Sequence, residues 1–329
     1  MEMKELYGGI DTHKENFAGC IVDEKGRVLR EHTFPATKEA VEKFTTGIPN
    51  TQMTIAIEAC GIWRGAYNIF RELGYEVKLA NPKITHDIAS GKKTDKVDAK
   101  TLADLLRTNY LPEVYIPDDD ILQLRDLTRH KANLTRLRVK VQVKIKGYLL
   151  RGGVKYGKNI WTEKALSELS ENDLNVRSLV NVYWSLKKEE KEVLNRIKKI
   201  ARNMKKTTLL MTMPGIGEYS ALLILGEIGD IKRFKTAKEL VSYAGLCPGI
   251  YQSGNTERTE RNQAVNKWLK WILYECSGRA SMLDTRFQSY YYKVQKKKGF
   301  KTARRAVARK MLTIVWHMLT KEEPYRMAS

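Results

Sequence analysis

The first 117 residues alternate short apolar runs with stretches whose apolar residues recur at helical spacing. Apolar runs bounded by turn residues predict strands over residues 7–11, 16–22, 27–34, 53–59 and 76–80. Helical spacing predicts helices over residues 37–46, 62–73 and 95–108, with a further helical stretch from residue 81 and Thr94 as the N-cap of the last helix. Three strands followed by alternating helices and strands are typical of an α/β layered domain.

The pattern changes at residue 118. Residues 121–150 contain no glycine or proline before Gly147, and they carry apolar residues at helical intervals among many lysines and arginines. A glycine pair at 152–153 interrupts the pattern before a second helical zone over 162–206. Two long charged helices around such a break predict an antiparallel hairpin or a coiled-coil arm, which commonly mediates oligomerisation. We therefore predict three domains: 1–117, 118–206 and a mainly helical 207–329.

The charge of the chain is strongly asymmetric. The net charge is +21, whereas residues 1–120 carry −4, so the remaining residues carry +25. Such an excess predicts a polyanionic partner, and nucleic acid is preferred over the alternative of a generally basic protein with well-solvated faces. Charge does not distinguish DNA from RNA, because both are bound first through phosphate.

The cysteines and apolar runs argue against several classes of protein. The four cysteines (Cys20, Cys60, Cys247 and Cys276) are isolated, so neither a zinc site nor a disulfide framework is expected. The first residues carry charges and no apolar signal-peptide core, and no run approaches the roughly 20 apolar residues that span a bilayer. We expect a cytoplasmic protein with no membrane partner.

Four carboxylates of the first domain form the main candidate for chemistry. Asp11 ends the first predicted strand and Glu58 the fourth, whereas Asp95 and Asp98 stand three apart on one face of the last helix. An acid directly after an apolar strand is costly to place there unless it is paired or ligated. Hard oxygen ligands suit Mg²⁺ or Mn²⁺. Taken singly, each acid has an ordinary alternative as a turn cap, a first-turn helix acid or a solvated side chain.

Two neighbours of these acids are given ordinary interpretations. His13 is expected to point away from the metal, because neighbouring residues on a strand face opposite sides. Asp104, further along the same helix, is a candidate outer-shell partner, and a solvated surface position is preferred for it.

The sequence motifs around the four acids resemble those of a known family. The segments G-I-D-x-H-K near the start and K-T-D-x-x-D-A-x-x-L-A later are similar to the DEDD transposases of the IS110 family of bacterial insertion sequences, relatives of the Piv DNA invertases. The resemblance implies an RNase H-like fold of the RuvC type for the N-terminal domain. It also implies that Asp11, Glu58, Asp95 and Asp98 are the metal-binding set.

A second signature of the same family lies in the last third of the chain. M-P-G-I-G-E-Y-S-A-L-L-I-L-G-E-I-G-D resembles its C-terminal transposase domain, with a helix-hairpin-helix-like turn at residues 214–217. Gly215 and Gly217 there let backbone N–H groups approach a phosphate, and a purely structural turn is an equal alternative. The Q-S-G motif contains Ser253, which composition alone would make a turn residue. The resemblance implies that Ser253 is the nucleophile that joins covalently to DNA.

The run after this serine departs from the family. Where the family reads I-T-K-x-G-N-x-x-L-R, this chain has Gln263 for the lysine and Val265 for the glycine, as a divergent copy would. Asn266 and Leu269 correspond to the family, and Lys270 stands for its arginine. The predicted nucleic-acid contacts are Lys92, Lys93, Gly215, Gly217, Gly254, Asn266 and Lys270.

The leading hypothesis is a DNA transposase or recombinase that works through Ser253 and the four carboxylates. The alternatives are a RuvC-like junction nuclease that uses metal-activated water, a Piv-like invertase, and a non-catalytic nucleic-acid-binding protein. The resemblance further implies guidance by a bridge RNA encoded by the element, and a homo-oligomer acting on two DNA duplexes. Because the acids and the serine fall in different domains, one site can combine acids of one protomer with the serine of another.

Overall fold

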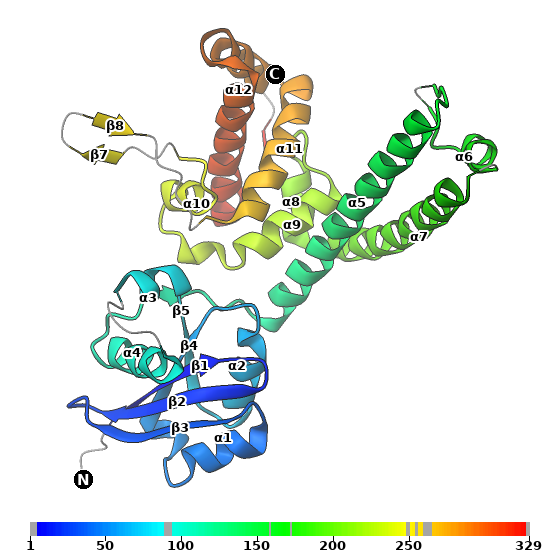
Figure 1. Ribbon diagram of the computed structural model, residues 1–329. Helices are drawn as coiled ribbons and strands as arrows, with labels where there is room; N and C mark the ends of the chain where they lie inside the picture. The colour runs from blue at the N-terminus through cyan, green and yellow to red at the C-terminus, as the bar shows by residue number, and fades with distance from the viewer. Residues whose placement is uncertain are drawn as a thin grey trace. The chain divides into compact units, whose positions relative to one another are not determined.

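The computed structural model describes residues 5–88, 94–157, 159–171, 173–247, 251–253, 256–258 and 265–326, with the backbone alone for 251–253 and 256–258. The chain divides into two compact units, Met1–Ile116 and Pro117–Ser329 (Figure 1). This division falls one residue before the first predicted domain boundary. The predicted arm and C-terminal region belong to one unit, so the boundary at 206–207 stays a prediction.

The first unit is built on a mixed six-stranded sheet with the strand order β3-β2-β1-β4-β5-β6. β1, β2 and β3 pair antiparallel, β1, β4 and β5 pair parallel, and β6 returns antiparallel to β5. The strands are β1 (Leu6–Thr12), β2 (Asn16–Asp23), β3 (Val28–Pro35), β4 (Met53–Glu58), β5 (Glu76–Ala80) and β6 (Glu113–Val114).

Helices cover both faces of this sheet. On one face, the first two helices bury Phe44 and Phe70 against strand residues such as Ile10 and Ile57. On the other face, the fourth helix buries Ala99 and Leu102 against small residues of the strands. The helices of this unit are α1 (Lys38–Thr45), α2 (Trp63–Glu72), α3 (Pro82–Ile88) and α4 (Asp95–Arg107), with a short 3-10 turn, η1 (Asn50–Gln52).

The α/β pattern predicted for this unit is confirmed. Each predicted strand is present. Wherever both ends of a strand or helix were predicted, the observed ends lie within one residue of the predicted ones. β6 was not predicted, because its two residues are too few to show an alternating pattern.

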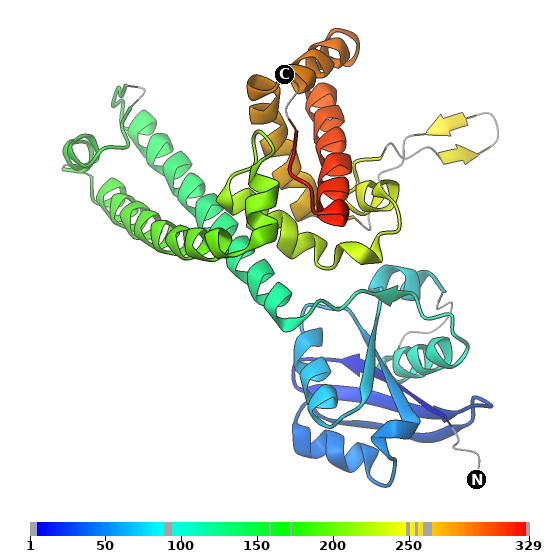
Figure 2. The same ribbon diagram turned by 180° about the vertical axis from the view of Figure 1, so that it is seen from behind.

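The second unit begins with two long antiparallel helices. α5 (Asp119–Arg151) and α7 (Leu174–Asn203) run side by side, with α6 (Glu163–Ser170) at the far end (Figures 1 and 2). Glu190 of α7 ties them together, because it accepts hydrogen bonds from Thr135 and Arg138 of α5, each at 2.7 Å. The predicted antiparallel helical hairpin is therefore present.

The rest of this unit is a helical cluster around one buried helix. Residues 220–228 of α9 are all buried. Most of its apolar residues pack with α8, α10, α11 and α12 in one core, whereas Leu222 packs with Leu124 of α5 and Ile197 of α7. No helix in the described ranges is long and apolar enough to span a membrane. The elements are α8 (Lys205–Met211), α9 (Glu218–Ile228), η2 (Ile231–Arg233), α10 (Ala237–Tyr243), β7 (Tyr251–Ser253), β8 (Thr256–Arg258), α11 (Lys267–Leu283) and α12 (Thr285–Lys321).

One glycine sets how closely α4 lies on the sheet. A Cβ atom on Gly9 would stand 1.9 Å from the carbonyl oxygen of Ala99 and 2.6 Å from the backbone nitrogen of Ala103. Because both are backbone atoms of α4, no side-chain rotation would make room. Gly9 therefore allows the helix backbone to rest on β1.

We predict that Gly9→Ala lowers the free energy of unfolding by about 3 kcal/mol, the upper range for overpacking, because α4 must move off β1. Urea denaturation measures the change. Gly8→Ala is the matched control: its new Cβ atom would lie 2.6 Å from the side-chain atom Cδ1 of Ile55, which a rotamer change can move. Equal losses in the two variants would contradict the backbone-contact explanation.

Candidate metal centre

Strand register brings Asp11 and Glu58 to the same edge of the sheet. β1 and β4 are parallel, and Ile10 pairs with Ile57, so Asp11 and Glu58 follow on neighbouring strands. Ile10 and Ile57 face the core formed with α1 and α2. Because side chains alternate along a strand, the two acids face the opposite side, which α4 covers.

The other two acids come from the first turn of α4. Thr94 caps this helix, since its hydroxyl accepts a hydrogen bond from the backbone N–H of Val97 at 3.3 Å. Asp95 is the first residue of the helix, and Asp98 lies almost one turn later. The contact at Gly9 holds this end of α4 near the end of β1.

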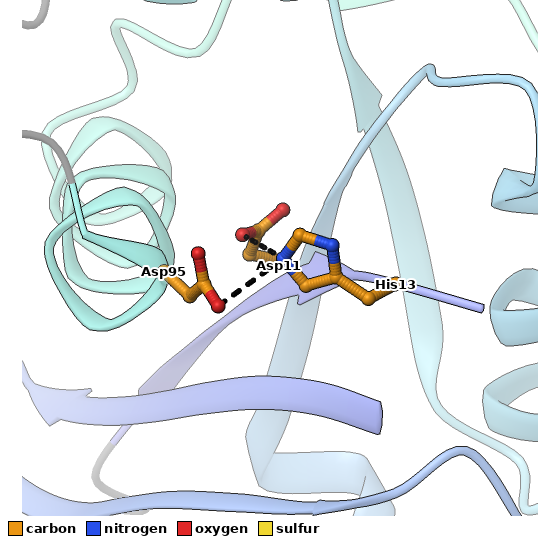
Figure 3. Close-up of side chains that lie close together, drawn as sticks. All are labelled: Asp11, His13 and Asp95. Carbon is orange, nitrogen blue, oxygen red and sulfur yellow. Dashed lines mark hydrogen bonds and ion pairs between the residues drawn. The ribbon is translucent and has the colours of Figure 1, made fainter. Parts of the chain in front are cut away.

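A histidine lies between two of the acids. The His13 ring nitrogen Nε2 is 3.2 Å from Oδ2 of Asp11 and 3.3 Å from Oδ2 of Asp95 (Figure 3). One ligand atom from each of the three residues lies within 4.8 Å of the others, so the group can hold a metal ion. Asp11 is the protected member, with 14% of its side chain exposed against 61% for Asp95.

The expectation that His13 points away from Asp11 was wrong. His13 stands two residues after Asp11, so strand alternation places both side chains on the same face. The opposite-face rule applies to Thr12, which contacts Cys60 at 3.1 Å. Correct counting along G-I-D-T-H would have included the histidine in the site.

Glu58 and Asp98 line a cavity beside this group. The cavity has a volume of about 410 Å³, and its lining includes Lys83, His86 and Thr101. Two acids from different elements thus meet across one cavity, with a lysine at its wall. The third acid of α4, Asp104, pairs with a basic residue of the same helix, because its Oδ1 accepts a hydrogen bond from Arg107 at 3.2 Å.

The charges of this site favour a bound cation. Burial raises the pKa of Asp11, and the negative charges of Asp95 and Asp98 raise it further, while His13 opposes the shift. Negatively charged carboxylates crowded in this way repel one another, and a bound divalent cation would neutralise that repulsion. The residues present therefore fit a hard divalent metal.

Comparison with known proteins assigns the chain to a family. Residues 8–152 match the DEDD domain of the IS110 family, described as Transposase, and residues 207–292 match the domain described as Transposase IS116/IS110/IS902 family. Together the two matches cover more than two thirds of the chain. The chain belongs to the IS110 family of transposases.

Relatives of this IS110-family chain align over most of its length. It is 24% identical to the transposase for insertion sequence element IS1111A of Coxiella burnetii, over 97% of this chain and 90% of the relative. It is 25% identical to the transposase for insertion sequence element IS1328 of Yersinia enterocolitica, over 85% of each chain. It is 26% identical to the pilin gene-inverting protein of Moraxella bovis, over 98% of each chain. These matches support a transposase or recombinase that acts on DNA.

The predicted nucleophile of the transposase lies in the second unit. Ser253 is the last residue of β7, and its backbone pairs with Thr256 of β8. Its side chain lies outside the described residues, as do Gly254, Lys92 and Lys93. Their predicted contacts with DNA or RNA stay predictions.

The two glycines of the predicted phosphate-binding turn differ in their surroundings. Gly215 has a φ of +86°, and a Cβ atom there would lie 2.6 Å from the carbonyl oxygen of Cys276 and 2.8 Å from the nitrogen of Ala280. Packing of the turn against α11 thus explains this glycine without a phosphate. Gly217 caps α9, and a Cβ atom there would have nothing within 4 Å.

Asn266 also has a structural task. Its Oδ1 accepts a hydrogen bond from the backbone N–H of Leu269 at 2.9 Å and caps α11. Its Nδ2 donates to Oε2 of Glu227 at 2.7 Å. A contact with nucleic acid would have to replace these bonds. Lys270, one turn further along α11, is half-buried.

We predict that Asp11→Asn weakens Mn²⁺ binding by at least about tenfold, because it removes one carboxylate ligand, a loss of about 1.4 kcal/mol or more. Titration followed by calorimetry or by the Mn²⁺ spin-resonance signal measures the affinity. Asp104→Asn is the matched control, since its carboxylate pairs with Arg107. Equal affinity in the native protein and Asp11→Asn would reject this metal centre.

Proposed function

We propose that the chain is a metal-dependent DNA recombinase in which the four carboxylates bind Mg²⁺ or Mn²⁺ and Ser253 attacks a DNA phosphodiester. The observation that carries the proposal is the convergence of acids from β1, β4 and α4 on one side of the sheet. The strand order and the position of α4 also support an RNase H-like fold for the first unit.

In this proposal each part has its own task. Asp11, Glu58, Asp95 and Asp98 hold the metal, which when bound stabilises negative charge on the reacting phosphate. The Ser253 oxygen forms a phosphoester with one strand end, and the other strand end leaves as a hydroxyl. A new strand hydroxyl then displaces the serine, so the phosphoester bond energy is kept for rejoining.

The test of this mechanism is a covalent intermediate. With Mg²⁺ and DNA carrying the element ends, the native chain is expected to form a protein–DNA adduct visible on a denaturing gel. Ser253→Ala is expected to abolish both the adduct and strand rejoining. Asp11→Asn is expected to lower both rates by at least about 100-fold, the range lost with an electrostatic stabiliser of the transition state.

The alternative is hydrolysis by metal-activated water, as in a junction nuclease. Normal cutting by Ser253→Ala, with no adduct in the native chain, would reject the serine mechanism and favour this alternative. The match to a pilin gene-inverting protein over 98% of each chain keeps site-specific inversion as a related outcome. Substrates with inverted sites distinguish inversion from transposition.

We also propose that an RNA guides the reaction and that the transposase acts as a homo-oligomer. The charge of +25 beyond residue 120 supports a second nucleic-acid partner. α12 is the clearest example, because residues 285–321 contain eleven lysines and arginines and no aspartate or glutamate. The exposed apolar residues Val139, Val143 and Leu150 of α5 support an interface between copies.

Sequencing of RNA that co-purifies with the chain tests the guidance proposal. We expect one structured RNA from the same genetic element, retained in Asp11→Asn because this variant leaves the basic residues of the chain unchanged. Addition of that RNA is expected to be required for recombination of donor and target DNA. Recombination with purified protein free of RNA would contradict guidance.

A further inference from the structure

The segment that contains Ser253 begins and ends at one polar cluster. It leaves α10 at Tyr243 and returns at Asn266, the N-cap of α11. The backbone N–H of Asn266 donates to the carbonyl of Tyr243 at 2.8 Å, and the Asn266 amide donates to the Tyr243 hydroxyl at 3.0 Å. These two bonds join the ends of the segment.

A buried carboxylate connects this junction to α5. Glu227 of α9 is fully buried, and its two oxygens accept hydrogen bonds from Nε and Nη2 of Arg129, each at 2.7 Å. Oε2 also accepts the bond from Asn266 at 2.7 Å. Glu227 therefore has a partner on α5 and a partner at the start of α11.

The surroundings of Arg129 are fixed as well. Burial lowers the pKa of Arg129, but the hydrogen bonds and charge of Glu227 outweigh it and raise the pKa overall. The guanidinium lies 5.7 Å from the ring centre of Trp268, in the first turn of α11. Arg125, one turn earlier on α5, donates to the carbonyls of Gly226 and Glu227 at 2.6 and 3.0 Å.

We propose that Arg129, Glu227, Asn266 and Tyr243 form a clamp that positions the Ser253 segment relative to α5. Both ends of the segment are joined to each other, and Asn266 donates to the buried Glu227 carboxylate, so a shift of Asn266 would take one hydrogen-bond donor from a buried charge. This proposal rests on the serine mechanism proposed above. It makes Glu227 and Asn266 positioning residues, which act on the reaction through Ser253.

The sharpest test moves the negative charge of the clamp from residue 227 to residue 266. In Asn266→Asp, two carboxylates face each other where an amide met a carboxylate at 2.7 Å. Aspartate is as good an N-cap as asparagine, so α11 stays capped and the change reports on the clamp. Adding Glu227→Gln removes this repulsion, because the new amide can donate to the introduced carboxylate, although Arg129 then loses its hydrogen bond to Oε2.

Two measurements are made on the full-length chain. The first is hydrogen exchange of backbone amides in residues 251–258, where Tyr251 pairs with Arg258 and Ser253 with Thr256. The second is the rate of the protein–DNA adduct. Asn266→Asp is expected to speed exchange and to slow adduct formation by about 100-fold, the loss that a misplacement of about 1 Å causes. The double variant is expected to show slower exchange and faster adduct formation than Asn266→Asp, while the lost bond from Arg129 to Oε2 keeps it short of the native chain.

Glu190→Gln is the matched control. Glu190 also accepts a 2.7 Å hydrogen bond from an arginine of α5, Arg138, but it ties α5 to α7 and not to α11. It is expected to lower stability without changing exchange in residues 251–258 or the adduct rate. Equal effects of Glu190→Gln and Asn266→Asp would overturn the proposal, as would a double variant no better than Asn266→Asp.

The outcomes also separate the clamp from the serine mechanism. If the native chain forms no adduct, the serine mechanism fails, and the exchange measurement alone decides the clamp. If the adduct forms and Asn266→Asp changes neither measurement, the serine mechanism stands and the clamp is wrong.

Discussion

The metal centre depends on how closely the backbone of α4 can approach β1. Gly9 has no Cβ atom, and the space that one would need is filled by the carbonyl of Ala99 and the nitrogen of Ala103. This contact sets the height of α4 over the sheet, and therefore the distance from Asp95 to Asp11. Gly9, Asp11 and His13 are spaced two residues apart, so β1 and the residue that follows it supply the contact and two candidate ligands.

The geometry of the second unit depends on a buried carboxylate. In its central helix, α9, residues 220–228 are all buried, and Glu227 is the charged residue among them. A buried carboxylate is tolerated only when cations and hydrogen-bond donors surround it. Arg129 and Asn266 meet that need, and in doing so they connect α5, α9 and α11 at one point. Buried charge thus determines geometry here, where close backbone packing does so in the first unit.

The contrast explains what could be predicted from the sequence. Strands such as β1 and β4 were placed to within one residue, because alternation and turn residues are local signals. The convergence of Asp11 and Glu58 followed from their positions at strand ends. Gly215 could not be assigned, because the atoms that exclude a side chain there belong to Cys276 and Ala280, some sixty residues later. Glu227 was missed, although a glutamate inside L-L-I-L-G-E-I is itself a signal that a buried partner exists.

The two ways of fixing geometry suggest how the candidate site tolerates change. A backbone contact such as that at Gly9 is insensitive to charge but does not accept added volume. A buried ion pair accepts small changes of shape but not the loss of one charge. The position of α4, and with it Asp95, therefore depends on close packing, whereas the clamp proposed for the serine segment consists of polar partners on four elements. The run that differs from the family at Gln263 and Val265 is followed by Asn266, which corresponds to the family and bonds to Glu227 and Tyr243 in this chain. These bonds join the ends of the segment whatever residues stand between them, so the divergence at Gln263 and Val265 is compatible with the proposed clamp.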